Sequence, residues 1–229
     1  MCRWIAYRGE TIPLERYVTE PAHSLVVQSL KAKESVGSTN GDGFGLGWYG
    51  ERDEPGLYRE VRPAWSDENL KHLCRHICSP LFFAHVRAAT GTPTTRPNCH
   101  PFVHGRWMFM HNGQVGDWSL IRRRVEELIP DEFYKSRAGT TDSEAVFLAI
   151  LGGGADADPI AATMRTLTTL TELVSTGALG KPRSAVATRL STRPRWATWF
   201  HDPKLSGGGG PARRPRKSGW GRRWREPPA

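Results

Sequence analysis

The feature that most constrains the fold is a loss of apolar periodicity near Gly180. Up to that point, apolar segments with the periods of strands and helices follow one another, whereas beyond it Gly, Pro, Arg and Trp alternate without a repeating pattern. A segment of that composition cannot bury enough surface to offset the entropy lost on ordering. We therefore expect a folded domain over residues 2–180 and a disordered tail over residues 181–229.

Charge changes at the same boundary. The tail carries 13 Lys and Arg against 2 Asp and Glu, whereas the whole chain of 229 residues has a net charge of +9. The domain is therefore close to neutral. Two origins are open for the tail: translation of a GC-rich gene in the wrong frame, or a basic segment that binds nucleic acid through its Lys, Arg and Trp side chains, which is the less favoured.

The chain has no run of about 18 apolar residues and no recognisable secretory leader, so we expect no membrane partner. Four cysteines in a chain of this size do not make a disulfide framework. The sequence therefore predicts a cytoplasmic protein with reduced thiols.

Apolar periodicity within the domain predicts both strands and helices. Strands are expected at 3–8, 43–50, 57–62, 81–90 and 106–113. Helices are expected at 23–33, 66–77, 118–128, 142–151 and 158–174. Ser66 is the expected N-cap of its helix, and Thr141 or Asp142 that of another. In the segment GFGLGWYG, glycines alternate with larger residues and would let another backbone or a ligand approach closely.

The last of these helices is expected because its apolar residues recur at spacings of three and four. They are Ile160, Met164, Leu167, Leu170 and Val174.

Cys2 directly follows Met1 and precedes a predicted strand. Removal of Met1 would make Cys2 the N-terminal residue, with an α-amine whose pKa of about 7.7–8.0 leaves it partly neutral at pH 7. A neutral amine can take the proton of the adjacent thiol, so one residue would supply nucleophile and base. The alternative is a small core cysteine, which is the commoner environment of a free cysteine.

Two segments could bind the charged groups of an amino acid. In HVRAATGT, Arg87 ends an apolar strand and its guanidinium suits a carboxylate, to which Thr90 can add a hydroxyl. In GTTDSEAV, Asp142 lies at a helix start and could bind an ammonium group. The alternatives are a surface ion pair for Arg87 and a carboxylate that only complements the helix dipole for Asp142.

The segment FMHNGQV contains Asn112-Gly113, which is the strongest short signal for a two-residue hairpin. The Asn112 side-chain amide and the Gly113 backbone N–H are also two donors that could stabilise an oxyanion. The two interpretations are compatible, because a tight turn exposes the N–H.

A metal site is a further alternative for the histidines and the cysteine near this segment. These residues are Cys99, His100, His104 and His111, with His85 further away. Their spacing lacks the close pairs typical of structural zinc sites, so we expect neither a metal nor another cofactor.

Taken in order, the Cys behind Met1, HVRAAT, HNG and TDSE resemble the glutaminase domain of class II glutamine amidotransferases, which are N-terminal-nucleophile hydrolases. NGDGFGLGWYG and the pair Pro101-Phe102 are similar to the stand-alone branch of that family, which includes the γ-glutamyl amide hydrolase of ergothioneine biosynthesis. The resemblance implies an α+β fold: a four-layer αββα sandwich of two antiparallel sheets between helices. Its second sheet would be incomplete if residues 181–229 add no strands.

The resemblance also implies a catalytic role for three residues. Cys2 would attack the side-chain amide of glutamine or of a γ-glutamyl compound, with its own α-amine as base. Asn112 and Gly113 would form the oxyanion hole. The product of the first step would be a γ-glutamyl thioester on Cys2.

For substrate binding the resemblance implies Arg87 with Thr90 for the α-carboxylate, Asp142 for the α-ammonium group, and His111 nearby. The synthases of the family have a His where this chain has Gly91, which argues against a synthase-type channel but not against hydrolysis. Released ammonia would pass to a partner synthase. The alternatives are an inactive truncated family member and nucleic-acid binding through the tail.

Overall fold

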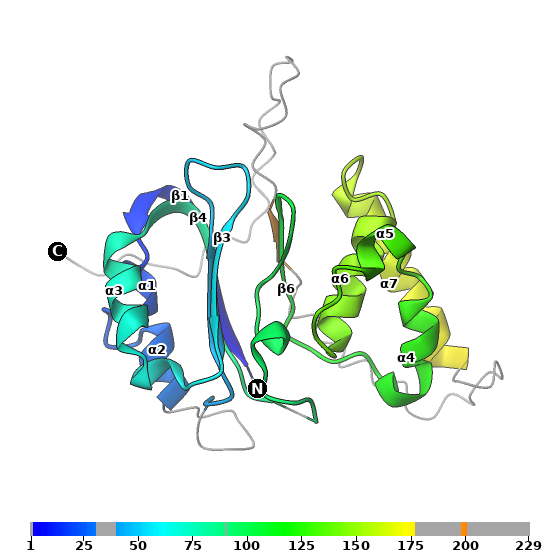
Figure 1. The fold of residues 1–229 in the computed structure, drawn as a ribbon, viewed down its shortest axis with the longest axis horizontal. Coiled ribbons are helices and arrows are strands. Elements are labelled where there is room, and N and C mark those ends of the chain that lie inside the picture. Colours follow the sequence, from blue (N-terminus) through cyan, green and yellow to red (C-terminus); the bar gives the residue numbers. More distant parts are fainter. Residues whose placement is uncertain (1, 31–39, 90, 177–197, 201–229) are drawn as a thin grey trace, which may run out of the picture.

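The computed structural model describes residues 2–30, 40–89, 91–176 and 198–200, the last of these as backbone only. Its elements form four layers: helices, two antiparallel sheets, and helices again (Figure 1). The expected α+β sandwich is confirmed. None of the helices in these ranges is long and apolar enough to cross a membrane.

The first sheet has β4 at its centre, antiparallel to both of its neighbours. In spatial order its strands are β1 (Arg3–Pro13), β4 (Cys78–Val86), β2 (Phe44–Trp48) and β3 (Gly56–Glu60). The helices beside its outer face are α1 (Glu15–Val18), α2 (Leu25–Leu30) and α3 (Glu68–His76) (Figure 1). Because both faces of β4 are covered, its sequence is a nearly continuous apolar run.

The second sheet contains three described strands. They are β5 (Phe102–His104), β6 (Trp107–Met110) and β7 (Thr198–Phe200). The helices beside its outer face are α4 (Trp118–Glu126), α5 (Asp131–Tyr134), α6 (Asp142–Gly152) and α7 (Pro159–Thr176) (Figure 1). The backbone of β7 pairs with β6 and comes from the segment expected to form a tail; residues 177–197 and 201–229 lie outside the described ranges.

Three apolar clusters fill the three spaces between the four layers. One joins α1–α3 to the first sheet, and another joins the second sheet to α4–α7. The third lies between the sheets and consists of Tyr49, Leu81, Phe83, Met108 and Met110. Inward and outward side chains alternate along β4 and β6, because successive residues of a strand point to opposite faces.

Glycines in β2 bring the second sheet close to the first. A Cβ atom on Gly45 would collide with the His100 carbonyl oxygen, and one on Gly47 would collide with the Met108 side chain. The expected close approach of another backbone at this strand is therefore confirmed.

The predicted N-cap of α3 was wrong by one residue. Asp67, not Ser66, caps the helix, and its carboxylate accepts a hydrogen bond from the Leu70 N–H at 2.9 Å. Ser66 belongs to the preceding 3₁₀ turn (Ala64–Ser66), where its hydroxyl donates to the Pro63 carbonyl. The short turn therefore displaces the helix start.

Only two of the five apolar residues noted at spacings of three and four in α7 are buried. Leu170 and Val174 are buried, but Ile160, Met164 and Leu167 are 76%, 59% and 44% exposed. The buried face of the helix instead runs through Ala162 and Thr166 to Leu170. The small residues Ala162 and Thr166 on that face let α7 pack closely beside α6, and Ile160, Met164 and Leu167 lie on the neighbouring, open face.

Candidate functional site

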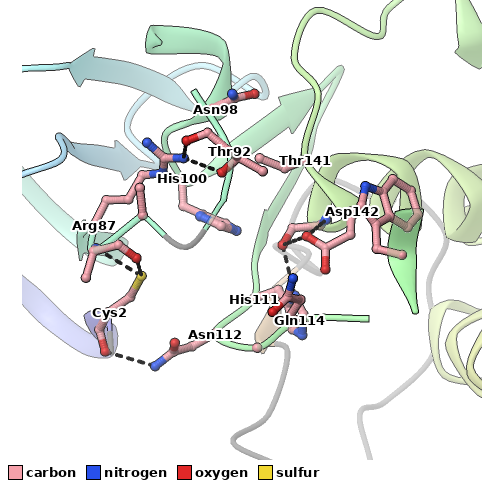
Figure 2. Close-up of a pocket in the computed structure, with 15 residues that line it drawn as sticks. Cys2, Arg87, Thr92, Asn98, His100, His111, Asn112, Gln114, Thr141 and Asp142 are labelled. Atoms are coloured by element: carbon pink, nitrogen blue, oxygen red, sulfur yellow. Dashed lines mark hydrogen bonds between the residues drawn. The ribbon is translucent and has the colours of Figure 1, made fainter. Parts of the chain in front are cut away.

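One pocket gathers most of the residues singled out from the sequence. It encloses about 540 Å³, part of it open solvent, at one end of the space between the two sheets. Its wall comes from the start of β1, the segment after β4, the segments around His100 and Asn112, and the start of α6 (Figure 2). The pairing of β1 with β4 explains how the first two of these segments meet. Arg3 pairs with Val86, so Cys2 lies beside Arg87 and Ala88.

The Cys2 thiol is held by one residue. The Ala88 N–H donates to Sγ at 3.3 Å, and the thiol donates to the Ala88 carbonyl at 3.4 Å. Burial raises the pKa of the Cys2 thiol, against the opposing effects of the Ala88 N–H and the Arg87 charge. The resting thiol is thus protonated at neutral pH and needs a base to become a nucleophile.

Arg87 is almost completely buried, at 4% exposure, and is fixed from two sides. Its Nη1 donates to the Asp42 carbonyl at 3.3 Å, and its Nη2 donates to Thr92 Oγ1 at 2.6 Å. The Asp42 carboxylate in turn accepts from the Ala89 N–H at 2.7 Å. The NGDG segment thus holds the segment after β4, while Thr90 lies outside the described residues.

Asn112 connects the two sheets at the pocket. Its Nδ2 donates to the Cys2 carbonyl at 3.0 Å. The predicted hairpin turn is absent at this place: neither Asn112 nor Gly113 has a positive φ, and the chain runs on from β6 to α4 instead of to a paired strand. Gly113 packs on His111, where a Cβ atom would lie 2.7 Å from Nε2.

Asp142 opens helix α6 and is 8% exposed. Its two oxygens accept from the Val115 N–H at 2.6 Å and the Ser143 N–H at 2.8 Å. Thr141 caps the helix by accepting from the Glu144 N–H at 3.2 Å, which settles the two candidates for this cap.

His111 lies beside Asp142 and shares a 2.9 Å hydrogen bond with the Ser143 hydroxyl. Burial lowers the pKa of His111, and the Asp142 charge acts in the opposite direction. The imidazole is therefore neutral at pH 7. The arrangement leaves one carboxylate and one buried guanidinium facing the same pocket.

The pocket brings together Cys2, Arg87, His111, Asn112, Gly113 and Asp142. Sequence reasoning missed Thr92, Asn98, Gln114, Trp118, Thr141 and Ser143 as lining residues and considered His100 only as a metal ligand. The sequence could have pointed to Thr92 and Ser143, because Thr92 lies two residues after Thr90 in HVRAATGT and Ser143 directly follows Asp142. Asn98 and Trp118 reach the pocket only through the folding of distant segments.

Two of the residues considered for zinc, Cys99 and His104, lie apart from the histidines of the pocket. Cys99 is buried with its thiol near the carbonyls of Glu60 and Thr95, and His104 packs edge-on against Phe133. In the part of the chain that the structure describes, no group of three or more His, Cys, Asp or Glu is placed to hold a metal ion.

Comparisons with known proteins agree with the fold. A probable glutamine amidotransferase of Saccharomyces cerevisiae, DUG3, is 38% identical over 160 residues, which cover 66% of this chain and 45% of the yeast protein. The γ-glutamyl-hercynylcysteine sulfoxide hydrolase of Mycolicibacterium smegmatis is 31% identical over 159 residues, or 69% of this chain and 65% of that protein. The chain thus spans about half to two thirds of these relatives.

Among solved structures, a glutamine aminotransferase class-II domain protein from Silicibacter pomeroyi is similar, with a TM-score of 0.56 and 40% identity. The match covers 74% of this chain and 62% of that one. The family profile "Glutamine amidotransferases class-II" matches residues 17–181, which is most of the described structure. The chain belongs to the class II glutamine amidotransferases.

Proposed function

We propose that this protein hydrolyses the side-chain amide of glutamine or of a γ-glutamyl compound through a thioester on Cys2. The observation that carries the proposal is the placement of the Cys2 thiol in one pocket with a buried guanidinium, Arg87, and a carboxylate, Asp142. These two opposite charges match the α-carboxylate and α-ammonium of an amino acid, and the thiol lies beyond them.

In the binding step, Arg87 holds the α-carboxylate and Asp142 the α-ammonium group, with His111 and the Thr90 segment beside them. The backbone N–H groups of Val115 and Ser143 hold the Asp142 carboxylate in place, so it accepts the ammonium group without rearranging. Fixing both charges leaves the side-chain amide extended toward Cys2, where proximity favours attack.

In the first chemical step, removal of Met1 leaves the α-amine of Cys2 free to take the thiol proton. Sγ then bonds to the amide carbon, and the carbonyl electrons move to the oxygen. The Asn112 amide carries two protons; one donates to the Cys2 carbonyl, and the other can stabilise this oxyanion together with the Gly113 N–H. Collapse breaks the C–N bond, and the leaving amine takes the proton from the α-ammonium.

In the second step, water attacks the thioester while the α-amine accepts its proton. The C–S bond breaks, and the glutamyl acid and the Cys2 thiol are regenerated. Every proton is returned, so the cycle needs no cofactor. Ammonia from glutamine would be handed to a partner synthase, and a reducing compartment such as the cytoplasm would keep the thiol competent.

The direct test is incubation of the purified full chain with L-glutamine or a γ-glutamyl amide, following release of the glutamyl acid. We expect activity in the parent and none in Cys2→Ala. Cys78→Ala is the matched control, because Cys78 is an exposed cysteine outside the pocket and its loss should leave the rate unchanged. Equal rates in the parent and Cys2→Ala would reject the proposal.

Two mass measurements sharpen this test. The mature chain should lack Met1, since an N-terminal extension would block the α-amine. A diazoketone analogue of glutamine should label the N-terminal peptide in the parent and not in Cys2→Ala. Labelling of any other cysteine instead would remove Cys2 from the reaction.

A further inference from the structure

Two histidines lie beneath the pocket with ring nitrogens that have no hydrogen-bond partner among the described residues. His85 is 1% exposed and His100 is 7% exposed, and their ring centroids are 4.5 Å apart. His85 lies on β4 within the sheet, whereas His100 lines the pocket itself. Of this pair, therefore, His100 is the one that a bound molecule can reach.

An unpaired polar group at this depth carries a free-energy cost unless a partner arrives. Burial lowers the pKa of His100 well below its usual value, and the nearby positive charge of Arg87 acts in the same direction. The ring is therefore neutral, with one N–H donor and one bare nitrogen. In Figure 2 the ring lies between Arg87 and Asp142.

Arg87 by itself cannot present a full pair of donors to a carboxylate in this structure. A guanidinium offers two parallel N–H pairs, one across Nη1 and Nη2 and the other across Nε and Nη2, so each pair includes Nη2. The two Nη2 protons already face Thr92 Oγ1 at 2.6 Å, the Thr92 carbonyl at 3.4 Å and the Pro93 carbonyl at 3.3 Å. One oxygen of a bound carboxylate is thus left without a partner from Arg87.

From this geometry we infer that His100 is a further substrate-binding residue, which donates its ring N–H to the α-carboxylate oxygen that Arg87 does not pair. The inference rests on the proposed function for the identity of the substrate. It also accounts for the neutral state of the ring, because a neutral imidazole adds a donor beside Arg87 without adding another positive charge.

His85 provides a matched comparison within the same pair. It is also buried, also neutral because burial lowers its pKa to about 3, and also without a partner among the described residues. It packs behind His100 and does not line the pocket. A purely structural role for the pair predicts similar consequences when either ring is replaced, whereas carboxylate binding predicts a difference in substrate affinity at His100 alone.

The experiment compares His100→Phe, His100→Gln and His85→Phe in the full chain. Phe keeps a flat ring beside Phe102 and removes the nitrogens, and Gln restores an N–H donor. The substrates are L-glutamine and 4-aminobutanamide, which is the same amide without its α-carboxylate. We expect His100→Phe to lower kcat/KM for L-glutamine about 10- to 100-fold, through KM, the loss typical of a hydrogen bond to a charged group.

The carboxylate-free substrate separates binding from structure. Its kcat/KM should change less than twofold in His100→Phe, and His100→Gln should recover part of the loss on L-glutamine. His85→Phe should leave the ratio between the two substrates unchanged. An equal loss on both substrates in His100→Phe, or the same selective loss in His85→Phe, overturns the inference while leaving the proposed function standing.

If the parent hydrolyses neither substrate, the proposed function fails and the inference is decided by binding instead. Calorimetry with L-glutamate and 4-aminobutanoate makes the same comparison without chemistry. A selective loss of L-glutamate affinity in His100→Phe supports the inference. An unchanged affinity, or no binding of L-glutamate by the parent, overturns it.

Discussion

The same strands build both ends of the space between the sheets, but one end is an apolar cluster and the other is the polar pocket. Along β4, the inward positions run from Leu81 and Phe83 to His85, and Arg87 follows the strand. At the first two positions the side chains form the apolar cluster that joins the sheets; at the last two they carry unpaired or charged groups beside the pocket.

Strand β6 repeats the same change. Met108 and Met110 belong to the apolar cluster, and Asn112, two residues further, donates to the Cys2 carbonyl. At one end of the space, burial of apolar side chains stabilises the sandwich. At the other end, buried polar groups without hydrogen-bond partners lower the stability of the fold. The pocket lies where the strands end, because residues beyond the paired backbone are not held in the alternating pattern of the sheet.

The largest expected effect is on the apolar end. Phe83→Ala should lower the free energy of unfolding by about 3–5 kcal/mol, because it removes a fully buried ring from between the sheets. Chemical denaturation followed by tryptophan fluorescence measures it. Leu120→Ala, at a residue that is 51% exposed on α4, is the control and should cost far less. Similar losses in the two variants would contradict the assignment of this cluster as the joint between the sheets.

At the polar end, we expect the free energy of unfolding to depend on pH through His85. Burial lowers the pKa of His85 from 6.5 to about 3 in the folded chain. As the pH falls, His85 is therefore protonated in the unfolded chain before it is protonated in the folded chain. The contribution of His85 is complete above pH 6.5 and is lost as the pH falls toward 3; between pH 6.5 and 5 the loss is about 2 kcal/mol.

His85→Phe should remove one proton from the pH dependence of unfolding in this range, which denaturation at several pH values detects. His72→Phe, at an exposed position of α3, is the control and should retain the parental dependence. A parental slope in His85→Phe would show that the ring is not held neutral in the folded chain.

A smaller effect is expected at the rim of the pocket. Thr141→Ala removes the cap of α6 and should cost about 1 kcal/mol of stability. Because the cap also positions Asp142, KM for glutamine should rise while kcat changes little. Thr141→Ser, which keeps the hydroxyl, should behave as the parent in thermal unfolding; a Ser variant as unstable as the Ala variant would argue against capping.

The smallest effect is expected away from both ends. Ile160→Ser on the open face of α7 should change the free energy of unfolding by less than about 0.5 kcal/mol, because the side chain is 76% exposed. Leu170→Ser, on the buried face of the same helix, is the matched comparison and should be clearly destabilising. A large cost at Ile160 would mean that this face of α7 is covered in the folded protein.

The order of the layers was implied by the family resemblance, whereas local periodicity predicted the individual strands and helices. The alternation around Gly45 and the apolar run of β4 predicted strands that are indeed buried by close neighbours. The spacing of apolar residues also predicted the helix α7, but it does not say which of two adjacent faces of that helix meets α6. Only the packing of small residues such as Ala162 decides that.

The pocket shows the same division. Arg87, Asn112 and Asp142 stood out because each follows or begins a regular element, where side chains are free to converge. His100 was weighed only as a metal ligand, because its significance comes from lacking a partner, and no spacing in a sequence records an unpaired nitrogen. The Asn112-Gly113 turn failed as a hairpin because the residues after it join α4 rather than a strand.

Gly45 and Gly47 have a consequence for the wall of the pocket. Because these positions have no side chains, the second sheet contacts the backbone of β2 directly. The His100 carbonyl lies against Gly45, and the Met108 side chain lies against Gly47. A methyl group added at Gly45 would collide with the His100 carbonyl oxygen, so the backbone that carries His100 would have to shift. This glycine thus ties the position of His100 in the pocket wall to the spacing of the two sheets.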